Sequence, residues 1–143
     1  MIEVQKVFTV TKPIGFVQEY LKDFANAAEW DPGTKSCTRQ GSGPVQVGAT
    51  WRNVSEFKGK ETELTYELTD SSPRHLQFVG TNKTVTSTDD ITMATVDGGT
   101  SITYHAEFEF HGIAKLASPF LKGDLEELAD KTATQMAQVI DSK

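Results

Sequence analysis

The stretch that decides the fold is Gly112–Lys143, which reads GIAKLASPFLKGDLEELADKTATQMAQVIDSK. Its apolar residues recur every three or four positions, and this spacing puts them on one face of an α-helix. A continuous helix here would be roughly 40 Å long at about 1.5 Å per residue. A helix of that length needs a sheet to cover, and the distance between the two decides whether a solid core or a pocket forms. The stripe consists of Ile113, Leu116, Ala117, Phe120, Leu121, Leu125, Leu128, Thr132, Met136, Val139 and Ile140.

A proline interrupts this pattern at Pro119. Proline inside a helix removes a backbone hydrogen bond and kinks the helix. We therefore expect Gly112–Ser118 to form a short turn or helical piece, with the main helix beginning near Pro119. Its first turns would lie beside the mouth of any pocket and could act as a ligand gate.

The chain before Gly112 is mostly strand-like, because its segments are rich in β-branched and aromatic residues. Turn residues at Lys58–Lys60, Ser71–Pro73 and Asp97–Gly99 separate several of these segments. Short connections of this kind make neighbouring strands antiparallel. The expected strands are Ile2–Val10, Ala49–Phe57, Thr62–Asp70, His75–Thr81, Val85–Val96 and Ser101–Phe110.

Two short helices are expected after the first strand. Thr11–Pro13 offers a capping hydroxyl and a proline that the first turn of a helix tolerates. Asn26–Glu29 suggests a further turn, and Trp30–Gly33 ends it because proline and glycine break helices. The helical spacing is carried by Val17, Tyr20, Leu21 and Phe24.

The order of these elements predicts an α+β fold in one domain, residues 1–143. An antiparallel sheet must bury one face, and the terminal helix is the only element long enough to cover it. The chain length suits one hydrophobic core, and no repeat or linker divides it.

Alternation along the strands predicts which side chains face the helix. In the last strand these are Ile102, Tyr104, Ala106, Phe108 and Phe110. Elsewhere the inward positions include small residues, which leave unfilled volume, and polar residues, which are costly to bury without a partner. Both features favour a cavity with polar anchors over a solid core. These small or polar inward residues are Ala49, Asn53, Ser55, Tyr66, Ser87, Asp89, Tyr104 and Ala106, with Ala117 on the helix.

Several short stretches, in their order and spacing, resemble the START-like (SRPBCC, helix-grip) superfamily and its polyketide cyclase/dehydrase-like branch. The resemblance implies a seven-stranded curved antiparallel sheet wrapped around a long C-terminal helix, two short helices after the first strand, and a hydrophobic cavity. Members bind lipids, sterols or aromatic polyketides, and some catalyse cyclisation or dehydration. The matching stretches are Thr11–Pro13, Trp30–Gly33, Val45–Gly48, Asp90–Thr92, Gly98–Thr100, and Phe110–Gly112 with Leu116–Phe120.

From this pattern and the resemblance we expect an apolar or aromatic small molecule to bind between sheet and helix. The two tyrosines, Tyr66 and Tyr104, could hydrogen-bond a ligand or could be core residues with hydroxyls at the rim. Similarly, Trp51 and Phe78 could stack on a ring or simply fill the core. The expected ligand-binding residues are Trp51, Asn53, Tyr66, Phe78, Met93, Tyr104, Phe108, Leu116 and Phe120.

Asp89 is the candidate catalytic residue for an alternative function, a polyketide cyclase or dehydratase. A carboxyl in an apolar pocket has a raised pKa and can act as a general acid or base. The competing interpretation is a bulge at Asp89–Asp90 that turns Asp89 to solvent. A third class of function is a protein-interaction module that presents the cavity rim to a partner.

Composition and charge exclude other classes of function. The net charge of −6 argues against nucleic-acid binding and against adsorption to anionic membranes. We find no apolar segment that could span a bilayer and no signal peptide, so we expect a cytoplasmic protein without stable membrane insertion. The sequence leaves monomer and homodimer open.

Cofactor and metal chemistry are not expected either. The glycine-rich stretch Gly41–Pro44 lacks the lysine and strand–helix context of a phosphate-binding loop, and Cys37 is the only cysteine. His105, Glu107 and Glu109 alternate along one strand as metal ligands can, but they have the outward parity of a solvated face. We therefore predict no cofactor and no metal site.

Overall fold

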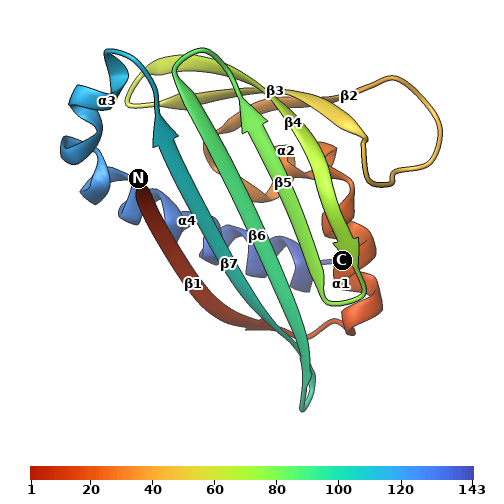
Figure 1. Ribbon diagram of the computed structural model, residues 1–143. Helices are drawn as coiled ribbons and strands as arrows, with labels where there is room; N and C mark the ends of the chain where they lie inside the picture. Colours follow the sequence, from red (N-terminus) through yellow and green to blue (C-terminus); the bar gives the residue numbers. More distant parts are fainter.

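Seven antiparallel strands form one curved sheet in the order β1-β7-β6-β5-β4-β3-β2 in the computed structural model, which describes residues 1–143 (Figure 1). Consecutive strands pair from β2 through to β7, and β1 joins the free edge of β7. The strands are β1 (Ile2–Val10), β2 (Thr34–Gln40), β3 (Thr50–Phe57), β4 (Lys60–Ser72), β5 (His75–Thr81), β6 (Val85–Val96) and β7 (Gly99–Phe110).

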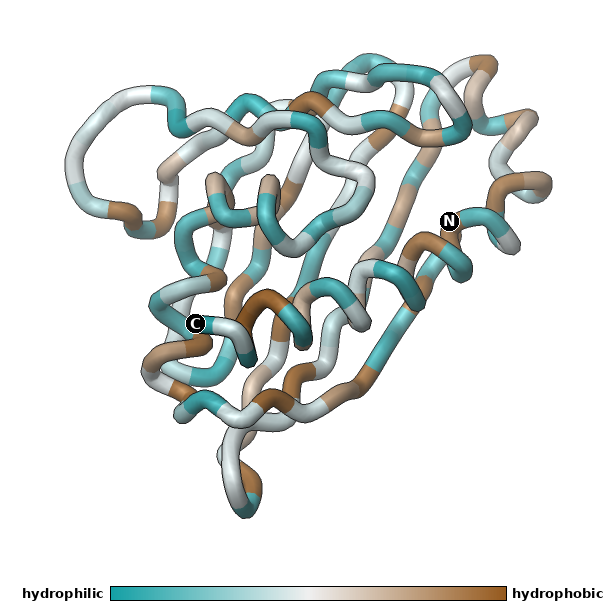
Figure 2. Tube along the Cα trace, turned by 180° about the vertical axis from the view of Figure 1, so that it is seen from behind, coloured by the Kyte–Doolittle hydropathy of each residue, from teal (hydrophilic) through white to brown (hydrophobic).

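The helices occupy two places in the chain. Between β1 and β2 lie α1 (Ile14–Lys22), the 3-10 turn η1 (Phe24–Asn26) and α2 (Ala27–Trp30). After β7 come α3 (Ala114–Ala117), the 3-10 turn η2 (Ser118–Phe120) and α4 (Lys122–Asp141). Figure 2, seen from behind, has α4 across the concave face of the sheet with its C-terminal end beside α1. The α+β helix-grip prediction is confirmed.

Strand β2 lacks the apolar alternation of the other strands and was not expected from the residue pattern. It is an edge strand that pairs only with β3, and its residues are half-buried or exposed. Because neither face is covered completely, its sequence TKSCTRQ stays polar. Only the resemblance to the superfamily implied the seventh strand.

The terminal segment is broken near Pro119, as predicted, and α4 has 20 residues, which corresponds to about 30 Å. The stripe predicted from Ile113 onward is wrong in its first part: Ile113, Leu116 and Phe120 are 88%, 77% and 83% exposed, and Ala117 is also exposed. Ile113 immediately precedes α3, and the others lie on α3 and η2 at the margin of the sheet (Figure 1), where no other element covers them. The buried stripe of α4 is Leu125, Ala129, Thr132, Met136 and Ile140.

The expected cap of α1 is also wrong. Pro13 is the N-cap residue and no side chain caps the helix. Instead, Thr11 donates two hydrogen bonds to Asp141 Oδ1, from its backbone nitrogen at 2.8 Å and from Oγ1 at 2.9 Å. Thr11 therefore ties the end of β1 to the end of α4.

An aromatic cluster closes one end of the space between helix and sheet. The ring of Phe24, from η1, lies 4.5 Å from the rings of both Tyr66 and Phe78. Trp30 packs edge-on against Phe24 at 5.9 Å, and Trp51 packs edge-on against Phe78 at 5.8 Å. Both tryptophans are fully buried. Phe24 of η1 and Trp30 of α2 therefore fill the space over this end of the sheet. None of the helices is both long and apolar enough to cross a membrane.

Candidate ligand-binding cavity

A cavity of about 170 Å³ lies between α4 and the concave face of the sheet. Two small residues face it, Ala106 from β7 and Ala129 from α4, and both are almost completely buried. Because each carries only a methyl group, helix and sheet leave volume between them. The other apolar residues that line the cavity are Val4, Phe57, Leu64, Val85, Phe108, Phe110, Leu121, Leu125 and Leu128.

Buried polar side chains also face this cavity. Asp89 from β6 is 4% exposed, and Tyr66 from β4 and Tyr104 from β7 are similarly buried. Asn53 from β3 lines the same wall and donates a hydrogen bond to Thr34 Oγ1 at 3.2 Å. The predicted inward parity of these residues is confirmed, because each strand keeps its alternation through the cavity wall.

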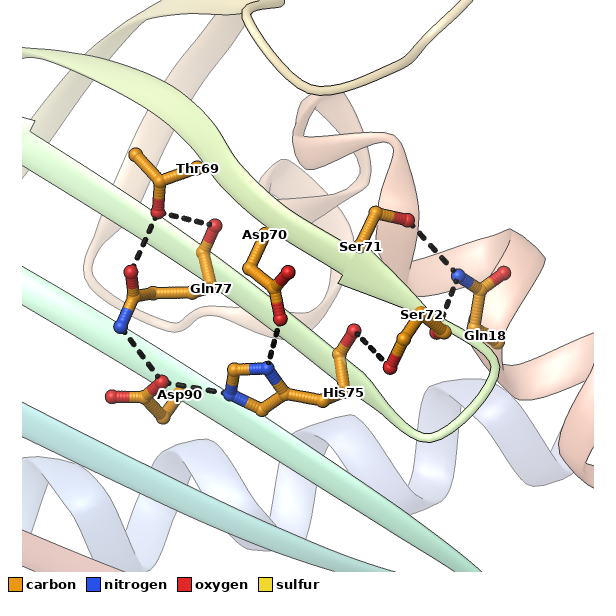
Figure 3. Close-up of polar contacts among 8 residues, drawn as sticks. All are labelled: Gln18, Thr69, Asp70, Ser71, Ser72, His75, Gln77 and Asp90. Carbon is orange, nitrogen blue, oxygen red and sulfur yellow. Dashed lines mark hydrogen bonds and ion pairs between the residues drawn. The ribbon is translucent and has the colours of Figure 1, made fainter.

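The outer face of the sheet explains why Asp89 points inward. The next residue, Asp90, lies on that outer face and accepts hydrogen bonds from His75 Nε2 at 2.8 Å and Gln77 Nε2 at 3.1 Å (Figure 3). The same histidine contacts Asp70 Oδ2 through Nδ1 at 2.6 Å. The register of β6 is continuous with both neighbours through these residues. The alternative of a bulge at Asp89–Asp90 is therefore wrong.

Burial sets the electrostatics of the cavity. It raises the pKa of Asp89 to about 8, with further contributions from the negative charges of Asp31 and Asp90; the Tyr104 hydroxyl acts in the opposite direction. Burial, and then the charge of Asp89, also raises the pKa values of Tyr66 and Tyr104. Near neutral pH the Asp89 carboxyl can thus exist in either protonation state.

A second carboxyl, Asp31, lies at the end of α2 and lines the cavity. Its Oδ1 accepts a hydrogen bond from the backbone N–H of Gly33 and its Oδ2 accepts one from Thr34 Oγ1, both at 2.9 Å. Burial raises the pKa of Asp31, and these two hydrogen bonds oppose the rise. Sequence reasoning missed this residue because Trp30–Gly33 was interpreted as the end of a helix and as a stretch that resembles the superfamily, and neither interpretation singled out the Asp31 side chain.

Gly80 makes room for one of the tyrosines. It lies opposite Tyr66 in the β4–β5 register. A Cβ atom at Gly80 would come within 2.6 Å of the Tyr66 ring, far inside van der Waals contact. The glycine therefore lets the ring lie flat against β5.

Five of the expected site residues line the cavity: Asn53, Tyr66, Asp89, Tyr104 and Phe108. Three others, Trp51, Phe78 and Met93, are buried in the core outside it. For Trp51 and Phe78 the physical reason is Phe24 of η1, whose ring packs against both and fills the space over that part of the sheet.

The last two expected site residues, Leu116 and Phe120, are exposed and do not line the cavity. The helix residues that do line it were part of the predicted stripe but were not named as site residues. They are Leu121, Leu125, Leu128, Ala129 and Thr132.

Metal-ligating residues gather only on the outer face. His105 and Glu107 lie with Glu3 of β1, their ligand atoms within 4.8 Å of one another, and Glu109 is not in this group. Hydrogen bonding with Glu3 raises the pKa of Glu107. In β2, burial raises the pKa of the Cys37 thiol to about 11, which disfavours a reactive thiolate.

A curved antiparallel sheet that grips a long terminal helix over a partly polar cavity defines a START-like, helix-grip protein. The chain belongs to the polyketide cyclase / dehydrase and lipid transport family, which residues 1–140 match. None of the curated proteins is significantly similar in sequence.

Solved structures share the fold at low sequence identity. The Zhui aromatase/cyclase of a Streptomyces species is 18% identical with a TM-score of 0.75, and the match covers 98% of this chain and 91% of that one. TTHA0849 from Thermus thermophilus is 13% identical with a TM-score of 0.80, covering 96% of both chains. A START superfamily protein from Mycobacterium smegmatis is 12% identical with a TM-score of 0.73, covering 98% and 94%.

Proposed function

We propose that this protein binds an apolar or aromatic small molecule in the cavity between α4 and the sheet. The observation that carries the proposal is the cavity itself, about 170 Å³ of space lined mainly by apolar side chains, with Asp89, Tyr66 and Tyr104 in its wall. Apolar pockets with a few polar groups are typical of small-molecule sites. Membership of a family named for cyclases and lipid transport supports the same conclusion.

The volume limits the ligand. A cavity of roughly 150 Å³ lined by apolar residues accommodates benzene, so a cavity of about 170 Å³ suits one aromatic ring with a short substituent. A larger ligand would extend past the half-buried residues Phe57, Phe110 and Leu121, which also line the cavity. These belong to the end of β3, the end of β7 and the residue before α4.

Titration of the protein with benzyl alcohol, with the heat of binding measured by calorimetry, tests the proposal. We expect saturable binding of one molecule per chain, and loss of binding in Ala106→Leu and in Ala129→Leu, since either substitution fills the cavity. The control is Ala94→Leu, which adds the same side chain at an exposed position of β6. Binding that survives both cavity-filling substitutions in folded protein would overturn the proposal.

Native mass spectrometry of protein purified from its own host complements this titration. A co-purifying apolar molecule would support the proposal and would identify the class of ligand. Repeated absence of a bound molecule, together with no thermal shift across lipid and polyketide panels, would count against it.

Asp89 favours a second candidate function, a cyclase or dehydratase. A carboxyl with a pKa of about 8 can accept and donate protons near neutral pH. In a cyclisation with loss of water, the Asp89 carboxylate would take a proton from a carbon beside a carbonyl, that carbon would form the new C–C bond to a second carbonyl carbon, and the carboxyl would give the proton to the oxygen of that second carbonyl. Loss of water repeats the exchange, because the carboxylate takes a second proton from the same carbon and gives it to the departing hydroxyl as the C=C bond forms. Each proton is returned, so the protein ends unchanged.

Deuterium exchange into acetophenone tests this second candidate without knowledge of the natural substrate. For an enzyme of this kind we expect the wild-type protein to accelerate exchange of the methyl protons in D₂O, as followed by NMR. The Asp89→Asn variant should bind the ketone and not accelerate its exchange. Equal exchange rates with the two proteins would remove the case for acid–base catalysis by Asp89.

A further inference from the structure

The charges around the cavity are all of one sign. Three carboxyl residues, Asp31, Glu56 and Asp89, line it, whereas no lysine, arginine or histidine does. Glu56 is exposed at the rim, and its Oε2 pairs with Lys35 Nζ at 3.0 Å. The two enclosed carboxyls therefore have no cationic partner from the protein.

None of the groups that face Asp89 carries a positive charge that could balance its carboxylate. Tyr104 and Tyr66 come from the neighbouring sheet wall, and Asp31 comes from the turn after α2. Helix α4 contributes only Leu125, Leu128, Ala129 and Thr132, which carry no charge. On the opposite side of β6, Asp90 adds negative charge from outside and is engaged by His75.

Resting on the proposed function, we propose that the ligand is a cationic amphiphile, an aromatic ring that carries a protonated amine, with its ammonium group on Asp89. The ammonium supplies the counter-charge that the cavity lacks. The electron-rich faces of Tyr66 and Tyr104 add attraction for a cation. The ring then occupies the apolar part of the cavity between Ala106 and Ala129.

This ligand class predicts a characteristic dependence on pH. The pKa of Asp89 is about 8 in the cavity, so its carboxyl is mostly protonated near pH 6 and must lose its proton to pair with an ammonium group. Affinity for an amine should therefore rise between about pH 6 and pH 8, by about tenfold or more. A neutral ligand that accepts a hydrogen bond from the protonated carboxyl would show the opposite trend.

The test compares benzylamine with benzyl alcohol, which have the same ring and differ in the terminal group. Calorimetry at about pH 8 should give benzylamine an affinity at least about tenfold higher, with proton release on binding. In Asp89→Asn this preference should fall to within about threefold. In the matched control Glu109→Gln, which removes an exposed carboxyl from the neighbouring strand β7 outside the cavity, the preference should remain.

The outcomes separate the two proposals. If benzyl alcohol binds in the cavity and benzylamine binds no better, the inference of a cationic ligand fails and the binding function stands. An amine preference that persists in folded Asp89→Asn, or an amine affinity that falls as pH rises, also overturns the inference. If neither compound binds, both the inference and the proposed function fail.

Discussion

Asp89 has the least ordinary environment of any residue in the molecule. Its neighbours Asp90 and Thr88 point to the outer face, and alternation along β6 sends its carboxyl into an apolar cavity. Burial raises its pKa to about 8, against about 3.9 in an unfolded chain. This single residue thus links the stability of the fold to the chemistry of the site.

The stability of the protein should consequently fall as pH rises past the unfolded pKa of Asp89. Between about pH 4 and pH 8 the folded state holds a proton that the unfolded state has lost, so the free energy of unfolding decreases with pH. We expect Asp89→Asn to be more stable than wild type at about pH 8.5, by on the order of 5 kcal/mol, and equal to it near pH 4. Urea denaturation at the two pH values measures this; a pH-independent difference would contradict it.

A second residue-scale prediction concerns Gly80. In Gly80→Ala the new methyl group would press on the Tyr66 ring, and we expect a loss of about 1–3 kcal/mol of stability. Gly123→Ala is the control, because a Cβ there meets nothing within 4 Å and the change should stabilise α4 by about 0.5–1 kcal/mol. Chemical denaturation measures the free energy of unfolding of both variants. Equal changes in the two variants would refute the packing role of Gly80.

At the scale of elements, strands β4, β5 and β6 are joined on their outer face by polar contacts around His75 (Figure 3). These contacts hold Asp70, His75 and Asp90 together opposite the cavity wall. Because a strand presents alternate residues to its two faces, fixing Asp90 outside also fixes Asp89 inside. The outer cluster therefore supports the site without touching it.

The contribution of His75 should depend on pH. Burial lowers the pKa of His75, but hydrogen bonds to Asp70 and Asp90 outweigh it and raise the pKa above its ordinary value. The stabilisation is thus complete below about pH 6.5 and is lost as pH rises through the raised pKa. We expect His75→Ala to cost about 1 kcal/mol more at about pH 5.5 than at about pH 8.5. Urea titrations of both proteins at these pH values would reveal it, and a cost that grows with pH would contradict it.

At the scale of the whole molecule, alternation predicted the sheet and the faces of its strands well. It placed Asn53, Tyr66, Asp89 and Tyr104 on the cavity side, because a period of two residues leaves only two choices once one face is buried. Strand β2 escaped prediction because an edge strand needs no apolar face.

The boundary between cavity and core could not be predicted from the strands. Trp51 and Phe78 share the inward face with Tyr66, and only the position of Phe24, from a segment outside the sheet, assigns them to the core. Likewise, the periodicity that gave α4 its buried stripe continues through Leu116 and Phe120, and no local signal reveals that the sheet ends before them.

The central claim is that a small apolar molecule occupies the space between α4 and the sheet, and magnetisation transfer between ligand and protein tests it most directly. With benzyl alcohol bound, we expect nuclear Overhauser effects from its ring protons to the methyl groups of Ala106 and Ala129, and none to exposed Ala94. Contacts confined to Ile113, Leu116 and Phe120, on the exposed segment after β7, would contradict the account.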